Sequence, residues 1–365
     1  MAVLCLAGLA VNGLTLGPAI RDHTPQGRTD FMGLYAGGKL AFTADLYKPD
    51  RVLETEAATE GMSSPTRLYL RLPCFALLYR PLTLLPYKTA SLIWEILCGA
   101  AMVGFVLVWP ATRRWETAAA CCWSLPAWMA WAEGQDLALV LLGIAISSSL
   151  SKRGRVTAAG FIASICMVKF HLFLLVPLWI VTRKQWQFAR GLIAGAACVT
   201  ALSFAVGGWG WPVRYFELIR QPSNNPYLDA MINLNALFAG SSHPEVGEAA
   251  AVVTLLLAVW LAVRHSPEWG LAAALAAGIL ITPHAYLADG ALLLPAILLV
   301  PGVSFAMRIP QIFLLTPIPW LMMLGGLGLI ARLSLFAFVL TLGAGALLRI
   351  VNLSARNAGR DALPG

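Results

Sequence analysis

The chain has 365 residues, of which 59% are hydrophobic and only 12% are charged. Soluble domains carry roughly 25% charged residues, so this composition excludes an ordinary soluble protein and predicts a polytopic membrane protein. The formal net charge is +8, and in such a chain Lys and Arg indicate loop orientation rather than a nucleic-acid partner.

The first apolar run, MAVLCLAGLAVNGLTLGPAI, covers about residues 1–20. It lacks the basic region that opens a signal peptide, so we expect an uncleaved first span. A long polar stretch of about residues 21–87 follows, and a second lies at about 208–248.

Eleven further apolar runs are separated by polar connections, and spanning a bilayer takes about 20 apolar residues. We therefore expect an all-α protein of about 12 transmembrane or re-entrant helices, forming a single domain over residues 1–350 with a short cytoplasmic tail at 351–365. The runs lie at about 88–109, 117–131, 137–150, 157–168, 172–182, 190–207, 249–264, 269–283, 286–300, 310–331 and 333–349.

Basic residues fall in alternate connections, which the positive-inside rule places in the cytoplasm. The remaining connections then open on the opposite, extracytoplasmic face, where nearly every unusual polar cluster lies and where the clusters can line one site. A transport path should instead place polar residues at mid-span, with repeat symmetry. The cytoplasmic set is Arg113-Arg114, Lys152-Arg153 with Arg155, Arg183-Lys184 with Arg190, Arg264, Arg308 and Arg349.

The stretch from Thr29 to Ala41 follows the first apolar run and carries Asp30 and Tyr35. Asp30 has two open interpretations: a helix cap, because Asp before an apolar run is a common helix start, or a base in acid–base chemistry at the membrane surface. Asp45 lies in Asp-Leu-Tyr-x-Pro, which is typical of a turn, so we expect it to be structural or to contact an acceptor.

Two clusters lie between the apolar runs that follow. Lys169-Phe170-His171 can bind a phosphate at the interface, or Lys169 can snorkel while His171 caps a helix. Glu133-Gly134-Gln135-Asp136 is either a tight turn with a cap or a source of groups that bind sugar hydroxyls.

Further polar groups lie at span ends. His284 and Tyr286 stand at a junction, with Asp289 one turn on, where a hydrogen-bonded structural pair and a catalytic role are both open. Arg71 and Arg80 lie in a Pro-punctuated amphipathic segment, which favours an interfacial re-entrant element whose arginines contact lipid phosphates. Trp209, Trp211 and Tyr215 indicate a second interfacial helix.

The sequence contains no Gly-rich phosphate loop, no HExxH, no GxSxG and no paired Asp-x-Asp of the nucleotide-sugar enzymes. Any sugar chemistry would therefore use a membrane-borne donor. The seven cysteines show no metal-ligand spacing, and we interpret them as packing residues. We expect neither a metal nor a cofactor.

Several blocks, in order over roughly residues 29–300, resemble glycosyltransferase family 87. DFMGLYAGGKLAFTADLYKP is similar to the block that opens that family, and YLRLPCFALLYRPLTLLPYKTASLIW to its "YPPFALLLxPLALLP…W" block. GQDLALVLL is similar to its "GQxNxLLLxLL" block, with Asp136 where Asn is usual, and TPHAYLADGALLLPA to "SPHxxxYDxxLLLPA".

The resemblance implies the GT-C fold and an inverting, metal-independent hexosyltransferase, most similar to enzymes that use polyprenyl-phosphate-mannose. It implies a lipid-linked or glycolipid acceptor, membrane lipids as partners and an active site facing the periplasm of a bacterial plasma membrane. By position, Asp30 is the expected base. Lys169, His171, His284 and Arg71 are expected to bind the donor phosphate, and Asp45, Tyr35, Gln135, Asp136 and Tyr286 the substrates. The alternatives are a lipid or sugar transporter (a flippase) and a transferase of another sugar.

Overall fold

The computed structural model describes residues 2–23, 29–59, 67–221, 228–300 and 305–361. In these ranges every regular element is a helix, and the extended pairing is limited to an isolated bridge between Met231 and Tyr286. The predicted all-α class is therefore confirmed. The chain divides into two compact units, which we describe separately: Met1–Phe170 with Gln187–Pro226 (unit 1), and His171–Trp186 with Tyr227–Gly365 (unit 2).

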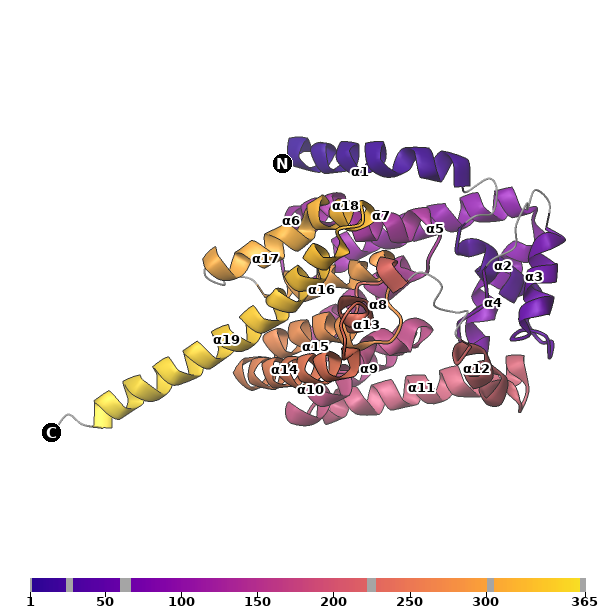
Figure 1. Ribbon diagram of the computed structural model, residues 1–365. Coiled ribbons are helices and arrows are strands. Elements are labelled where there is room, and N and C mark those ends of the chain that lie inside the picture. The colour runs from indigo at the N-terminus through magenta and orange to yellow at the C-terminus, as the bar shows by residue number, and fades with distance from the viewer. Residues whose placement is uncertain (1, 24–28, 60–66, 222–227, 301–304, 362–365) are drawn as a thin grey trace. The chain divides into compact units, whose positions relative to one another are not determined.

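Unit 1 contains the N-terminal half of the helices (Figure 1). Within it α5 packs on α8, α8 on α9, and α1 on α6. Its elements are α1 (Ala2–His23), α2 (Phe31–Lys39), α3 (Pro49–Ala57), η2 (Pro73–Phe75), α4 (Ala76–Tyr79), η3 (Arg80–Leu84), α5 (Tyr87–Val108), α6 (Arg114–Trp123), α7 (Leu125–Ala132), α8 (Leu137–Lys152), α9 (Val156–Ala163), η4 (Ser164–Phe173), α11 (Trp186–Gly207) and α12 (Trp211–Ile219). The last part of η4 and the first residue of α11 fall in unit 2.

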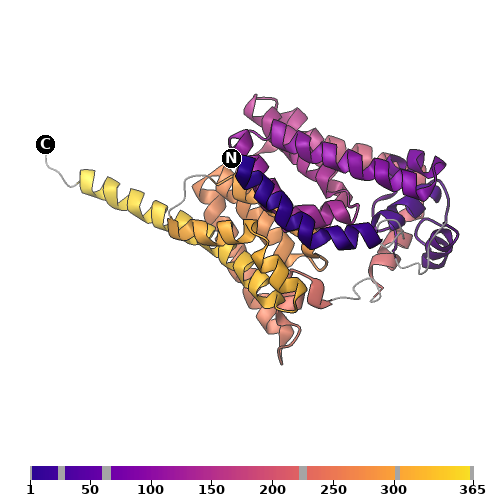
Figure 2. The ribbon, with the colours of Figure 1, turned by 90° about the horizontal axis from the view of Figure 1, so that it is seen from above.

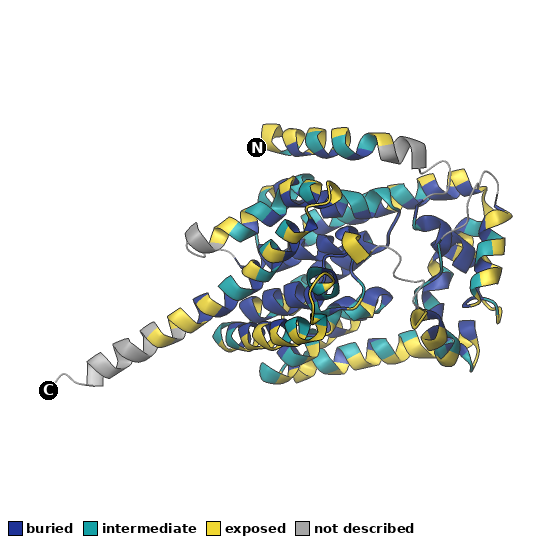
Figure 3. Cartoon of the chain, in the orientation of Figure 1, coloured by how far each residue is buried: buried dark blue, intermediate teal, exposed yellow. Residues whose placement is uncertain are grey.

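Unit 2 is built around α14, α15 and α19, which pack against one another. Figure 3 shows α15 and α16 as largely buried, and all six residues of α16 are buried. Its elements are α10 (Val176–Thr182), η6 (Leu228–Ala230), α13 (Leu234–Phe238), α14 (Pro244–His265), α15 (Pro267–Ile281), η7 (Leu287–Leu292), α16 (Leu293–Leu298), α17 (Phe305–Leu315), α18 (Ile318–Leu324) and α19 (Gly328–Asp361).

Five helical segments of the described residues are long and apolar enough to cross a membrane, so the chain is a membrane protein. They are Tyr87–Val108, Val156–Phe173, Trp186–Gly207, Pro244–His265 and Gly328–Arg349. Their apolar surfaces remain largely exposed, as α11 shows in Figure 3, because lipid rather than protein is the solvent for them. Shorter apolar helices occupy several of the other predicted runs.

Two helices of unit 1 approach closely at small residues. A Cβ on Gly160 in α9 would lie 2.0 Å from the carbonyl oxygen of Phe188, and one on Gly191 in α11 would lie 1.8 Å from that of Thr157. Only glycine fits at either position, which is the packing device that membrane helices use where apolar side chains gain nothing over lipid.

Both polar stretches contain helices, two of them where the sequence predicts elements: α4 in the re-entrant segment of Arg71 and Arg80, and α12 at Trp211 and Tyr215. The stretch at 21–87 includes α2, α3, α4 and two 3₁₀ turns, and the stretch at 208–248 includes α12 and α13. The tail at 351–365 also differs, because α19 continues to Asp361. Figures 1 and 2 both show the end of α19 extending beyond the other helices of unit 2.

Candidate active site

The tight turn Glu133–Asp136 between α7 and α8 organises the polar groups of unit 1. Gly134 has a φ of +63°, and its carbonyl oxygen accepts a hydrogen bond from the indole nitrogen of Trp94 at 2.7 Å. The backbone N–H of Gln135 donates to the carbonyl of Ala130 at 2.8 Å, and that of Phe31 donates to the carbonyl of Glu133 at 3.2 Å. The turn is thus bonded to the start of α2 and lies beside Asp30.

The carboxylate of Asp30 contacts one hydrogen-bond donor and one cation from distant parts of the chain. Gln135 Nε2 donates to Asp30 Oδ2 at 2.6 Å, and Arg67 Nε lies 3.3 Å from Asp30 Oδ1. The side chain keeps 38% of its surface exposed. Asp30 stands at the N-cap position of α2, as the helix-cap interpretation expects, but its side chain makes no capping bond. The carboxylate is oriented yet accessible.

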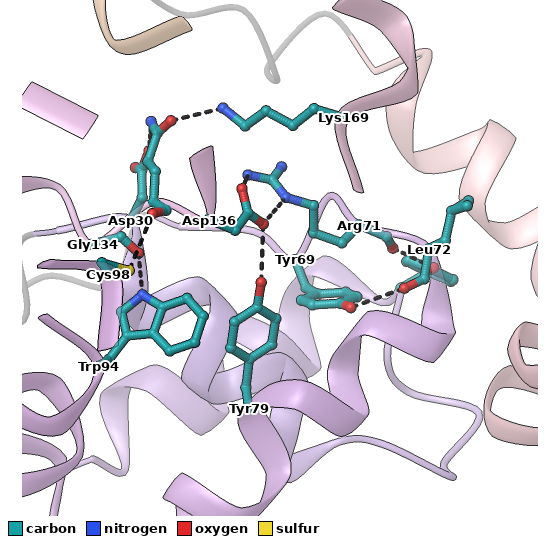
Figure 4. A network of polar contacts seen from close by, with 12 residues as sticks. Asp30, Tyr69, Arg71, Leu72, Tyr79, Trp94, Cys98, Gly134, Asp136 and Lys169 are labelled. Atoms are coloured by element: carbon teal, nitrogen blue, oxygen red, sulfur yellow. Dashed lines mark hydrogen bonds and ion pairs between the residues drawn. The ribbon is translucent and has the colours of Figure 1, made fainter. Parts of the chain in front are cut away.

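Lys169 is linked to the Asp30 carboxylate by hydrogen bonds through the Gln135 side chain. Its ammonium nitrogen donates to Gln135 Oε1 at 2.7 Å, and its residue is 4% exposed. The backbone is non-helical at Lys169, with a φ of −134°. Figure 4 shows the hydrogen bonds that link Lys169 to Asp30 through Gln135. The alternative in which Lys169 snorkels is wrong, because its side chain is buried and bonded to an acceptor.

A second network joins two residues predicted to contact substrate and donor. Arg71 Nε and Nη2 donate to the two carboxylate oxygens of Asp136 at 2.7 and 3.1 Å, and the Tyr79 hydroxyl donates to Oδ2 at 2.9 Å (Figure 4). Burial opposes ionisation of Asp136, but the Arg71 guanidinium holds its pKa below the ordinary value. Contact of either residue with a substrate or a phosphate stays a prediction.

Glu133 is a second carboxyl group beside Asp30. Its residue is half-buried, and the backbone N–H of Asp30 lies within hydrogen-bonding distance of its carboxyl group. Burial, together with the nearby Asp30 charge, raises the pKa of Glu133 to about 7, whereas Arg67 opposes the increase. Glu133 thus titrates near neutral pH next to the expected base.

Two predicted substrate residues of the N-terminal stretch make local contacts. The Tyr35 hydroxyl donates to the carbonyl of Leu85 at 2.8 Å, and its ring is buried. Asp45 pairs with Lys48 at 2.8 Å and with Arg51 at 3.5 Å, and the hydrogen bond from Lys48 lowers the pKa of Asp45. These contacts agree with a structural role for Asp45. Substrate contact by either residue is untested.

The histidine cluster lies in unit 2. The rings of His171 and His284 are 6.1 Å apart between centroids, and those of His284 and Tyr286 are 4.9 Å apart. Asp289 Oδ2 accepts the backbone N–H of Tyr286 at 2.8 Å in a capping box, which gives this buried carboxylate a structural partner. The structure therefore brings together two separate groups in unit 1: Asp30 with Gln135 and Lys169, and Arg71 with Asp136. A third group lies in unit 2 and contains His171, His284 and Tyr286.

Sequence reasoning misses Arg67, Tyr79 and Glu133 as members of these networks. Arg67 belongs to a polar stretch of several charged residues, and its distance of 37 positions from Asp30 gives no sign of contact. The sequence pattern identifies Glu133 only as part of the turn. Among the described residues, no group of three His, Cys, Asp or Glu side chains is placed to hold a metal ion.

Comparison with known proteins gives one match. A model of glycosyltransferase family 87 matches residues 72–295, which is more than half of the chain. Neither the curated proteins nor the solved structures contain a match. The matched region begins directly after Arg71 and includes the 133–136 turn, Lys169 and the histidine cluster. The chain is a membrane protein of glycosyltransferase family 87.

Proposed function

We propose that the protein transfers a hexose, with mannose as the expected sugar, from a polyprenyl-phosphate-linked donor to a lipid-linked or glycolipid acceptor. Transfer inverts the anomeric centre and uses no metal. The observation that carries the proposal is the state of Asp30: its carboxylate is oriented by Gln135 and Arg67 and still has 38% of its side-chain surface exposed. A general base needs both features, because it must be aimed and must reach the substrate.

In the proposed reaction Asp30 accepts the proton of the acceptor hydroxyl as its oxygen attacks the anomeric carbon. Attack comes from the face opposite the phosphate, so the new glycosidic bond forms as the bond from the anomeric carbon to the phosphate oxygen breaks. The electron pair of that bond leaves with polyprenyl phosphate, which gains a negative charge. The donor is already activated as a phosphodiester, so the reaction needs neither a nucleotide nor a metal.

The leaving phosphate needs cations near it, since charge that develops in the transition state is stabilised by fixed positive groups. Lys169, His171, His284 and Arg71 are proposed for this role. Lys169 is the member already bonded into the network of Asp30, through Gln135. Substrate contacts are proposed for Tyr35, Asp45, Asp136 and Tyr286.

The proposed architecture is a GT-C fold of about 12 transmembrane or re-entrant helices, with the active site on the periplasmic face of a bacterial plasma membrane. The alternation of basic connections along the sequence supports this orientation. The short helices α2, α4 and α12 fall in connections that this alternation assigns to the extracytoplasmic side.

The test is the Asp30→Asn variant in proteoliposomes supplied with polyprenyl-phosphate-mannose and glycolipid acceptors. Asn keeps the shape and removes the base, so we expect kcat to fall roughly a hundredfold to ten-thousandfold with donor binding retained. Asp50→Asn, an exposed carboxylate at the start of α3, is the matched control. Transfer at the wild-type rate by Asp30→Asn would remove Asp30 as the base.

Donor competition identifies the sugar. The proposal expects polyprenyl-phosphate-mannose to be consumed in preference to donors carrying glucose or arabinose. Movement of intact lipid-linked sugar across the bilayer without formation of a new glycosidic bond would instead indicate the transporter alternative.

A further inference from the structure

The Gln135 side chain lies between Lys169, which can only donate hydrogen bonds, and the Asp30 carboxylate, which accepts them. Lys169 Nζ donates a hydrogen bond to Gln135 Oε1 at 2.7 Å, and the Asp30 carboxylate accepts one from Gln135 Nε2 at 2.6 Å. An ammonium has no acceptor and an ionised carboxylate has no donor. The amide therefore has one orientation that satisfies both neighbours, and the reverse orientation would set two donors, and two acceptors, against each other.

We infer that Gln135 and Lys169 form a positioning relay for Asp30, in which Lys169 fixes the Gln135 amide and the amide aims the Asp30 carboxylate. This inference rests on the proposed function, because it takes Asp30 as the base. It assigns Gln135 a role other than the expected binding of substrate hydroxyls, and gives Lys169 a role additional to the expected binding of the donor phosphate.

The relay is built from rigid parts. Gln135 is 6% and Lys169 4% exposed, so water does not compete freely for their hydrogen bonds. The Gln135 backbone is fixed by its N–H bond to Ala130 and by the indole of Trp94 bonded to the preceding carbonyl. A hydrogen bond to a charged group in such a setting is stronger than one between neutral groups. Asp30 is the exposed end of this otherwise buried chain.

Lys169 can serve the relay and the donor together. An ammonium has three N–H groups, so contact with a phosphate oxygen does not require Lys169 to release Gln135. In the part of the chain that the structure describes, Arg67 and Glu133 are the other charged groups that face Asp30. Arg67 approaches the second carboxylate oxygen, Oδ1, so it orients Asp30 from another side and leaves Oδ2 to the Gln135 amide.

The test is a double-mutant cycle on kcat at saturating donor and acceptor, with Gln135→Met, Lys169→Met and the double variant. Each single change is expected to lower kcat roughly tenfold to a hundredfold, the loss of one hydrogen bond to a charged group. If Lys169 acts on Asp30 through Gln135, Lys169→Met lowers kcat less in the Gln135→Met background than in the wild type, and only the loss from its proposed contact with the donor phosphate remains. Matched controls are Gln221→Met and Lys88→Met, at exposed positions of unit 1, with kcat expected to be unchanged.

The division of the loss between kcat and KM separates positioning from general structural damage. A change that only misaims the base lowers kcat and leaves the KM for the acceptor and the thermal midpoint unchanged, so Gln135→Met should show this pattern, and a merely structural defect should not. Should Gln135→Met fail to fold, Gln135→Glu keeps the shape and the contact to Lys169 but turns an acceptor towards Asp30. Its kcat should fall in the same way, again without a change in the KM for the acceptor.

Losses that multiply in the double variant, or a loss in Gln135→Met that appears in the KM for the acceptor and not in kcat, would overturn the relay. Because Asp30→Asn is measured in the same assay, its inactivity would then leave the proposed function intact. Full activity of Asp30→Asn would overturn the proposed function itself.

Discussion

At the scale of single residues, the environment of Asp30 is decided by which neighbours carry charge. Arg67 and the Gln135 amide contact its two carboxylate oxygens, and the carboxyl group of Glu133 lies nearby. Asp136, the next residue after Gln135, is instead closed off by Arg71 and Tyr79. The two aspartates carry the same functional group, but burial and partners leave one accessible and pair the other with protein donors.

Glu133 gives the first prediction at this scale, on stability against pH. Its pKa is raised from 4.5 to about 7 in the folded protein, so its stabilising contribution is complete below about 4.5 and is lost as pH rises through about 7. This difference in pKa corresponds to at most about 3 kcal/mol of unfolding free energy. In Glu133→Gln the stability should fall less between pH 4.5 and pH 7.

The measurement is the midpoint of thermal unfolding in detergent across this pH range, and Glu217→Gln, an exposed carboxylate of α12, is the control. Parallel pH curves for wild type and Glu133→Gln would show that the pKa of Glu133 does not differ between the folded and the unfolded protein, and would contradict the assignment.

At the scale of elements, the 133–136 turn is the part on which the site depends. It links α7 to α8, bonds to the start of α2 and receives the Trp94 indole from α5. Gly134 makes this possible, because its φ of +63° is costly for other residues and a Cβ there would lie 2.7 Å from the Cβ of Phe31. The helices supply rigidity, and the turn sets the direction of Gln135.

Gly134→Ala should therefore reduce both stability and transfer. The left-handed conformation costs roughly 1–2 kcal/mol for a residue with a Cβ, and the clash with Phe31 adds to this by moving α2 and Asp30. We expect kcat to fall at least tenfold, measured with the thermal midpoint on the same sample.

Gly154→Ala is the matched control for this prediction. Gly154 has a φ of +76°, but no atom lies within 4 Å of the point that a Cβ would occupy, so its change carries the conformational cost alone. Equal activity losses in Gly134→Ala and Gly154→Ala would show that contact with Phe31 does not matter to the site.

At the scale of the whole molecule, orientation in the membrane follows from the alternation of basic connections. Single cysteines at Lys48, Asp229 and Arg153, all exposed, test it. In right-side-out vesicles, an impermeant thiol reagent should label Lys48→Cys and Asp229→Cys directly, and Arg153→Cys only after permeabilisation, because Lys48 and Asp229 lie in the predicted extracytoplasmic stretches.

Wild type, with its seven native cysteines, gives the background for this labelling. Opposite accessibility of Lys48→Cys and Asp229→Cys would contradict the prediction that both polar stretches lie on the same side of the membrane.

The sequence determined the membrane class, the helical fold and the family on its own. Apolar runs of span length leave helices as the only way to satisfy the backbone in lipid, and runs predicted at 88–109, 137–150 and 190–207 correspond to α5, α8 and α11. It also drew attention to Asp30, Gln135 and Lys169. Their interpretation was incomplete, since helix capping and snorkelling were equally compatible with the local pattern.

Only the tertiary structure decided what these residues contact. Asp30 is 105 positions from Gln135, and Gln135 is 34 from Lys169, and no period or spacing in a sequence encodes such a meeting. This contact depends on the turn at Gly134, the hydrogen bond from the Trp94 indole and the non-helical backbone at Lys169. Together they place the Gln135 amide between the Lys169 ammonium and the Asp30 carboxylate. Long-range packing selects the partner of each polar group, because a buried donor or acceptor must find one, and the sequence alone does not say which.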